Sequence, residues 1–486
     1  MDFAFAGYPS AFVFETPNGE KIDHLIWGDF IRLLGPEIDD WVSVRIRGTT
    51  GWMRKRDIQR ERLLEINFVD IGQGDGCFIV TPDDKFLLVD AGEGDNMFRF
   101  LRWRFNLKKH PEQTVTFQSA VVSHPDSDYY RGFAPLFDDS QFLFETVYHN
   151  GIIERAGDDA LGPVEKVNGT RYLADVIIDH ESLETILRSP DKVGRARYPN
   201  LLKTASESGR VGDIRMLCAE DRFLPGYEDD KKLVIRVLGP VPESDQAGRR
   251  LLRWFGDEGK TKNGHSVVLK LEYGDVKIML GGDLNVPAEN HLLPHYTGLN
   301  PDPETSQERE TLIGKARETF EADVAKACHH GSADFTNHYL QAVNPIATVI
   351  SSGDNEPHSH PRPDALGASG KSGRGERPLI FSTELARSAK ETISHPQTLR
   401  AEIKDLFSLR EKTEEEEVRV RLDPKIQKLL EKIERTVTVY GLINLRTDGD
   451  RVLLAQKLEK PAPRGGWDIY SLGPDEDGRL KSIPEH

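Results

Sequence analysis

Apolar positions in the first part of the chain come in short stretches separated by turn sequences. In residues 10–58, aromatic and β-branched residues alternate with Asn-Gly and Gly-Thr-Thr-Gly turns. This pattern is typical of short β-strands joined by tight turns. We therefore predict a small β-domain over residues 1–62, with strands in SAFVFET, HLIWGDFIRLLG, DWVSVRIRG and GWMRKRDI.

After residue 62 the apolar residues form longer, nearly continuous runs, which are typical of buried strands. Strands are predicted at Leu64–Val69, Gly76–Val80 and Phe86–Val89, followed by another in SAVVSH. HSVVLKLEYGDVKIMLGGD predicts a hairpin around Tyr-Gly-Asp. DVAKACHHGS and PIATVISSGDNEPHSHP each predict a strand followed by a loop. These strands form the framework of a second domain, residues 63–486.

Polar segments interrupt this framework. Residues 150–260 are mixed and polar with helical pieces such as YLADVIIDHESLETILRS, and we interpret them as an insertion. Residues 366–432 are charged and helical, and their run EKTEEEEVRVR is typical of a solvated helix face. A C-terminal hairpin is predicted at about 434–460, around Thr-Asp-Gly-Asp.

Charge and cysteine content narrow the class of protein. The formal charge of −16 repels phosphate backbones, which disfavours tight non-specific duplex binding but leaves room for a local basic groove. Cys77, Cys218 and Cys328 form no CxxC pair, so reduced intracellular thiols are expected. The apolar N-terminus is broken by Gly7 and Pro9, and no run approaches about 18 apolar residues. We expect a cytoplasmic protein without a membrane partner.

Carboxylates and histidines gather where the predicted strands end. Alone, each has an ordinary structural explanation, such as capping a turn or lying in a polar surface loop. Together they are harder to dismiss, because five of the fifteen histidines fall in three such loops. Carboxylate and imidazole ligands together suit Zn²⁺, Mn²⁺ or Fe, so one or two divalent metal ions are expected. The residues are Asp90, His124, Asp126, Asp128, Asp283, His329, His330, His358 and His360.

Five motifs resemble, in order, those of the metallo-β-lactamase-fold hydrolases, and in particular the ComEC-like branch, which contains the C-terminal domain of a competence DNA-uptake protein. They are FVDIGQGDGCFIVTPDDKFLLVDAG, SHPDSDYYRGF, NGHSVVLKLEYGDVKIMLGGDL, KACHHGS and SSGDNEPHSHPRPDAL. The resemblance spans roughly residues 64–366 and the terminal hairpin. In addition, DWVSVRIRGTTGWM resembles bacterial SH3-like domains. The implied fold is α/β, a four-layer αββα sandwich with insertions, preceded by a small SH3-like β-barrel.

The resemblance also implies a role for each strand-end residue. The implied ligands are His124, Asp126 and His329 for a first metal, and Asp128 and His360 for a second, with Asp283 bridging both. Asp90 would orient the ligand loop from behind. His330 would face the substrate or support the ligands, although the choice between His329 and His330 as ligand stays open. Asn263 would hydrogen-bond the substrate, and His265, two positions away, carries less weight.

Tyr129 departs from the pattern. The H-x-D-x-D-H loop of this branch predicts a histidine at this position, and SHPDSDYYRGF has a tyrosine. A neutral phenol, with a pKa near 10, is a poor ligand for a divalent metal. Three outcomes are open: a weaker second site, a single-metal enzyme, or an inactive fold kept for binding. Mn²⁺ would tolerate the remaining oxygen-rich set better than zinc.

The first functional hypothesis is a phosphodiesterase or nuclease that uses metal-activated hydroxide. Asp128 would orient the hydroxide, and His330 or Tyr130 would stabilise the oxyanion or the leaving group. The acidic charge favours a single strand, a short oligonucleotide or a nucleotide as substrate. The alternative is a weakened or inactive regulatory protein whose SH3-like domain binds a protein partner. Hydrolysis of a non-phosphate ester is a lesser alternative.

Overall fold

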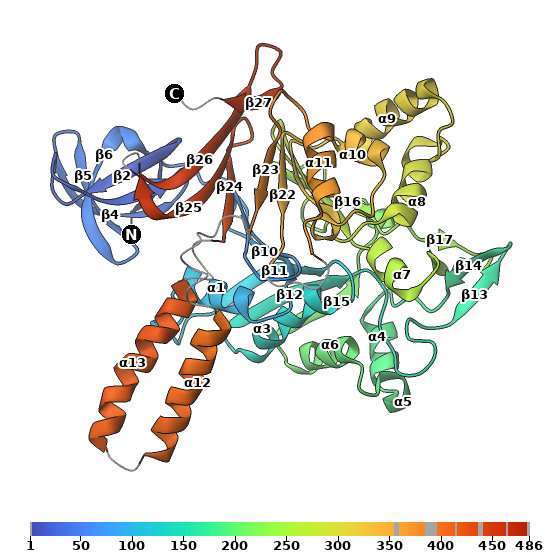
Figure 1. The fold of residues 1–486 in the computed structure, drawn as a ribbon, viewed down its shortest axis with the longest axis horizontal. Helices are drawn as coiled ribbons and strands as arrows, with labels where there is room; N and C mark the ends of the chain where they lie inside the picture. Colours follow the sequence, from blue (N-terminus) through green and yellow to red (C-terminus); the bar gives the residue numbers. More distant parts are fainter. Residues whose placement is uncertain are drawn as a thin grey trace.

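The computed structural model describes residues 2–353, 359–383, 396–413, 416–435, 441–462 and 465–483. Within these ranges the strands form four sheets, and the chain is mixed α/β (Figure 1). None of the described helices combines the length and the apolar composition that a membrane-spanning segment requires.

The N-terminal sheet confirms the predicted short strands but not their closure into a barrel. Its strand order is β3-β2-β6-β5-β4-β1-β7, and within residues 2–59 no pairing joins β3 to β7. The strands are β1 (Phe3–Ala6), β2 (Ser10–Phe14), β3 (Lys21–Ile26), β4 (Phe30–Ile38), β5 (Trp41–Ile46), β6 (Thr49–Arg54) and β7 (Ile58–Gln59).

Strand β3 contacts the C-terminal part of the chain, which is the physical reason why its edge is not used to close a barrel. It lies against β26 (Gly465–Pro474), and Trp467 Nε1 donates to the carbonyl oxygen of His24 at 2.8 Å. Trp27 packs in the same interface with Leu453 of β25 (Val452–Ala462). The N-terminal sheet is thereby attached to the rest of the molecule, as Figure 1 shows at the left.

The large sheet has the order β15-β12-β11-β10-β9-β8-β24-β25-β26-β27, with β10, β11, β12 and β15 parallel. The strands predicted between residues 64 and 89 and the terminal hairpin are confirmed in it. Its strands are β8 (Leu64–Phe68), β9 (Gly76–Val80), β10 (Phe86–Ala91), β11 (Val115–Val122), β12 (Phe142–His149), β15 (Val211–Met216), β24 (Ile443–Thr447), β25 (Val452–Ala462), β26 (Gly465–Pro474) and β27 (Leu480–Ile483).

The facing sheet packs its apolar side on that of the large sheet. Ile66 and Ile79 of the large sheet share one buried cluster with Leu269 and Ile278 of the facing sheet. Each fully buried side chain of this kind stabilises the fold by roughly 1.5–3 kcal/mol. In order across the sheet, its strands are β16 (Leu233–Gly239), β19 (Val268–Tyr273), β20 (Val276–Leu280), β21 (Val324–Lys326), β22 (Ala347–Ile350) and β23 (Leu379–Ser382).

Residues 150–260 contain both added elements and framework strands. Strands β15 and β16 of this segment extend the large and the facing sheet. The helix predicted from residue 172 begins only at His180, because Thr170–Leu173 pairs as a strand. The small sheet consists, in order, of β13 (Val164–Val167), β14 (Thr170–Leu173), β18 (Arg250–Arg253) and β17 (Glu243–Ser244).

Helices cover the outer faces of both central sheets, so the layers run helix, sheet, sheet, helix. On the facing sheet, Leu312, Ala316 and Phe320 of α9 are buried at four-residue intervals, which presents one apolar stripe to the sheet. The helices are α1 (Asn96–Arg104), α2 (Ser127–Tyr130), α3 (Ala134–Asp138), α4 (His180–Leu187), α5 (Pro190–Val193), α6 (Arg197–Glu207), α7 (Glu258–Gly264), α8 (Val286–Thr297), α9 (Ser306–Phe320), α10 (Asn337–Val343), α11 (Pro363–Ser372), α12 (Pro396–Lys412) and α13 (Glu416–Arg435).

Residues 366–432 were predicted to be a helical insertion, but Leu379–Ser382 within them forms strand β23, because it pairs with β22 of the facing sheet. Farther along this segment, α12 and α13 form a helical hairpin that projects from the body of the molecule (Figure 1). Leu406 packs there with Leu422 and Ile426, while Val420 is exposed. Residues 414–415 of the acidic run lie outside the described residues.

Candidate functional site

The strand-end loops predicted to form a site meet at one edge of the two central sheets. Strands β10 and β11 are parallel, and so are β20 and β21, so within each pair the carboxyl ends reach the same edge. The structure brings together His124, Asp126, Asp128, Asp283, His329 and His330.

Asp283 lies at the centre of this cluster. Its Oδ2 atom is 3.7 Å from Nε2 of His124, 3.8 Å from Nε2 of His329 and 3.9 Å from Nε2 of His330. Asp126 Oδ2 is also 3.7 Å from Nε2 of His124. These separations exceed a hydrogen bond and leave room for a cation between the groups.

The surroundings of His124 fit a cation. The side chain is fully buried, and its Nε2 has no hydrogen-bond partner among the described residues. Its Nδ1 is 3.0 Å from Oγ of Ser123 and 3.3 Å from Oγ of Ser266, whose own proton is donated to the carbonyl of Asn263. With the His124 proton on Nδ1, the Nε2 lone pair faces two carboxylates, and a cation or a second proton there removes the repulsion. Burial opposes a charged ring, but Asp126 and Asp283 outweigh it and raise the pKa of His124.

Other partners already engage some of the expected ligands. Among the residues that the structure describes, no three His, Cys, Asp or Glu side chains form a ready metal-binding group. Lys262 of α7 makes an ion pair with Asp126 and lies 3.1 Å from Glu154. Burial opposes ionisation of Asp126, but His124 and then Lys262 outweigh it and lower its pKa to about 2. Asp126 is thus an anion with a cation beside it.

Tyr129 lies inside the cluster, close to the ligands that a histidine at this position would have joined. The side chain is fully buried, its hydroxyl donates to Oδ1 of Asp283, and the hydroxyl oxygen is 3.0 Å from Nε2 of His330. Its ring centroid is 4.0 Å from that of His124. Burial, with the charge of Asp283, raises the pKa of Tyr129 well above its usual value. The phenol is therefore neutral and acts as a hydrogen-bond donor.

His330 is enclosed by acidic groups rather than facing an opening. It is 3% exposed, with Nε2 at 3.3 Å from Oδ2 of Asp128 and Nδ1 at 3.1 Å from the carbonyl of Ser351. Asp75 Oδ1 lies 3.5 Å from Nδ1. Burial lowers the pKa of this imidazole, but Asp283, Asp128 and Asp75 outweigh burial and raise it to about 10. His330 is a buried cation at neutral pH.

His329 and His360 lie on the open side of the cluster. The His329 side chain is 27% exposed, and its ring centroid is 5.5 Å from that of His360. Both His329 and His330 have left-handed backbone angles, with φ of 50° and 53°, within the short turn Cys328–Gly331. Such backbone costs of order 1–3 kcal/mol for a non-glycine residue, and the planes of the two neighbouring rings lie at 74° to each other. His358 of the same motif lies outside the described residues.

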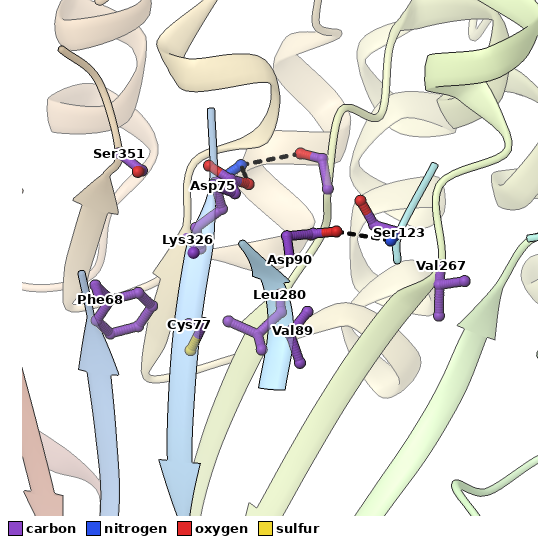
Figure 2. A pocket seen from close by; sticks show the side chains of 12 residues that line it. Phe68, Asp75, Cys77, Val89, Asp90, Ser123, Val267, Leu280, Lys326 and Ser351 are labelled. Atoms are coloured by element: carbon purple, nitrogen blue, oxygen red, sulfur yellow. Dashed lines mark hydrogen bonds and ion pairs between the residues drawn. The ribbon is translucent and has the colours of Figure 1, made fainter. Parts of the chain in front are cut away.

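Buried carboxylates support the loops from below (Figure 2). Asp90 Oδ1 accepts the backbone N–H of Ser123 at 2.7 Å, directly before His124 in the chain. Burial raises the pKa of Asp90 to about 8. Asp75 makes a buried ion pair with Lys326, which also donates to the carbonyl of Gly282 at 3.1 Å. A cavity of about 20 Å³ lies among these groups.

Gly74 packs the GQGDG turn directly against the loop that carries Asp128. Its φ is +101°, and a Cβ atom built there would lie 1.6 Å from the carbonyl oxygen of Asp128. Ser351 Oγ donates to the carbonyl of Gly74 at 2.8 Å. A glycine is required at this position, because any side chain would displace Asp128.

Three predicted residues lie apart from the cluster or have other partners. Tyr130 is buried in the core on the outer side of the large sheet, with its ring centroid 4.8 Å from that of Tyr198. Asn263 does not present its amide to solvent. Its hydrogen-bonding surroundings place the amide nitrogen 2.8 Å from Oδ2 of Asp126. His265 is buried with Nε2 at 2.7 Å from a backbone carbonyl oxygen, and burial lowers its pKa to about 3.

The prediction from sequence did not include Asp75, Lys262 and Lys326. Asp75 lies in the GQGDG turn, and Lys262 directly precedes Asn263. Both residues are therefore in or next to a recognised motif, but the motif resemblance assigned neither of them a role. Lys326 carried the clearer signal, because a lysine within the buried strand segment DVAKAC requires an acidic partner.

Comparison with known proteins shows a distant relative. No protein-family model matches the chain. The chain is 22% identical over 315 residues to ComE operon protein 3 of Bacillus subtilis (strain 168). The match covers 62% of this chain and 30% of that protein, so the chain spans about a third of its relative's length. The similarity agrees with the ComEC-like resemblance of the motifs.

Proposed function

We propose that the chain is a metal-dependent hydrolase of the metallo-β-lactamase fold, acting on phosphodiester bonds. The order of layers, helix, sheet, sheet, helix, supports the αββα sandwich, and the strand-end cluster lies at an edge of the two sheets, where the motif resemblance expects it. For the N-terminal sheet we propose an SH3-like unit that serves as an attachment site for a protein partner.

The proposed metal ligands are Asp283 and five carboxylate and histidine side chains of the neighbouring strand-end loops. His124, Asp126 and His329 would hold a first divalent ion, Asp128 and His360 a second, and Asp283 both. A divalent metal, when bound, activates water and neutralises charge that develops on phosphorus.

Three side chains of the protein would orient the attacking water or hold the ligands in place. Asp128, held by Gly74 and paired with His330, would orient the attacking water. His330 is buried and remains a cation at neutral pH, so it would act by holding Asp128 in position rather than by touching the substrate. The hydroxyl of Tyr129 fixes Asp283 by donating to it, so that one carboxylate oxygen is directed to the histidines.

The unpartnered Nε2 of His124, buried between Asp126 and Asp283, carries this proposal. The test is elemental analysis of the purified protein, followed by Zn²⁺- or Mn²⁺-dependent cleavage of bis-p-nitrophenyl phosphate and labelled single-stranded DNA. We expect bound metal and turnover, both lost in the His124→Ala/Asp283→Ala double variant. Fewer than about 0.2 metals per chain, with no turnover above that variant, would refute the proposal.

A second candidate function is a binding protein with a weakened metal site. It is favoured by the ion pair of Lys262 with Asp126 and the hydrogen bond of Tyr129 to Asp283, since both engage expected ligands without a metal. For this candidate, oligonucleotide binding would persist in excess chelator and no hydrolysis would accompany it.

A further inference from the structure

Two adjacent strands of the large sheet carry polar residues on the sheet's outer face. In the antiparallel register of β8 and β24, Glu65 lies opposite Arg446, and Asn67 lies opposite Asn444. The alternate residues of both strands, such as Ile66, are buried against the facing sheet. A sheet face that packs on a helix is apolar, whereas this part of the outer face has charges and amides paired across it.

A cavity of about 450 Å³ lies over this polar face. Its walls come from the N-terminal sheet, from α1 with the turn that follows it, and from β24–β26. The volume is within the range of about 300–1,000 Å³ found for small-ligand pockets. None of the lining residues belongs to the candidate functional site, so the cavity is a separate feature of the molecule.

Positive charge is in excess in this cavity, although the whole chain carries −16. Glu65 is shared by Arg104 at 3.2 Å and Arg446 at 2.9 Å. Burial opposes ionisation of Glu65, but these two arginines outweigh it and lower its pKa to about 2, so it counts as a full negative charge. Among the described lining residues, two acidic groups, Asp29 and Glu65, face five basic ones: Arg47, Arg104, Lys109, Arg446 and Lys457.

Two further features indicate the chemistry of a ligand. The Arg446 side chain lines the cavity and is 4% exposed, and its Nε has no hydrogen-bond partner among the described residues. This N–H group is therefore a buried hydrogen-bond donor that a ligand in the cavity could satisfy. Two indole rings also line the cavity. Trp103 of α1 is 40% exposed, and Trp467 is fixed through its Nε1 to the backbone of β3. Guanidinium groups suit phosphate oxygens, and an exposed indole suits a planar base.

We propose that this cavity binds a nucleotide, with the phosphate held by Arg104, Lys109 and Arg446 and the base stacked on Trp103. The ligand is either a free mononucleotide or the phosphorylated end of a single strand, since the two share this chemistry. The cavity would hold the ligand at the junction of the N-terminal sheet and the large sheet.

The test is isothermal titration calorimetry of the full chain with AMP, adenosine, inorganic phosphate and a 5′-phosphorylated tetradeoxyadenylate. The His124→Ala/Asp283→Ala variant in chelator serves as the protein, so that binding at the candidate functional site is removed. Saturable binding of AMP or of the oligonucleotide, weakened by salt, is expected. Tighter binding of AMP identifies a free nucleotide, and binding of the oligonucleotide alone identifies a strand end.

Exposed lining residues provide the variants, because they leave the core intact. Lys109→Ala and Trp103→Ala should each weaken binding by at least about fivefold. The matched control is Lys108→Ala, which removes an exposed lysine that does not line the cavity and should leave binding unchanged. The proposal is overturned if neither nucleotide ligand binds saturably, if Lys108→Ala weakens binding as much as Lys109→Ala, or if phosphate alone binds as tightly as AMP. Metal content and turnover are measured separately, so failure here is distinguishable from failure of the proposed hydrolase.

Discussion

The buried ion pair of Asp75 and Lys326 should contribute strongly to stability, and its contribution can be measured by a double-mutant cycle. Lys326 is 5% exposed and Asp75 is 7% exposed, so removing one partner leaves a charge with little access to water. Such a change typically costs about 3–5 kcal/mol. For Lys326→Met we expect the lower end, about 3 kcal/mol, because His330 Nδ1 lies 3.5 Å from Asp75 and compensates part of the charge.

Asp75→Asn should cost a similar amount, because Lys326 then keeps, among the described residues, its hydrogen bond to the carbonyl of Gly282 and the attraction of Asp283 without a direct ion pair. The double variant should lose about 3–4 kcal/mol rather than the sum of both, a coupling of about 2–3 kcal/mol. Urea unfolding followed by tryptophan fluorescence measures each value, and an unchanged m-value validates the comparison. Lys277→Met, at the exposed position of β20, is the matched control and should change stability by no more than about 0.5 kcal/mol. A loss below about 1 kcal/mol for Lys326→Met, or additive single variants, would refute the reasoning.

Three further outcomes are expected. Tyr129→His should raise the number of metal ions retained per chain and the activity, and an unchanged metal content would show that residue 129 is not at a ligand position. Burial raises the pKa of Glu289 from 4.5 to about 8, so between these pH values the folded state binds a proton that the unfolded state has lost. The free energy of unfolding should therefore fall as pH rises, by at most about 1.4 kcal/mol per pH unit, and a stability–pH curve for Glu289→Gln should lack this component. Gly74→Ala should displace Asp128 and reduce hydrolysis more than it reduces thermal stability, and full activity in this variant would argue against that contact.

The part of the fold that could be predicted is the part with continuous apolar runs. The strands between residues 64 and 91 and the hairpin of β19 and β20 are examples, because burial on both faces leaves a clear pattern. Strand β15, with the sequence VGDIRM, was not identified because polar residues interrupt it and its position depends on pairing with β12. The barrel was predicted from local strands, but the edge of β3 contacts β26, which no local pattern reveals.

For the site, the order of strand ends was enough to place His124, Asp283 and His329 in one cluster. The pairing of Lys262 with Asp126 joins positions more than about 130 residues apart, and such ion pairs have no periodicity in a sequence. The hydrogen bond of Tyr129 to Asp283 is of the same kind, since only the folded chain brings the two together.

The position of β24 beside β8 also determines the order in which the protein can assemble during synthesis. Residues 64–68 pair with residues 443–447, about 380 positions later, so this edge of β8 cannot pair with β24 until residues 443–447 have left the ribosome. Pairings over such separations fold slowly, and an open strand edge is a site for aggregation. We expect nascent chains that stop before residue 443 to depend on chaperones, whereas the N-terminal sheet, whose strands all lie within sixty residues, can form early.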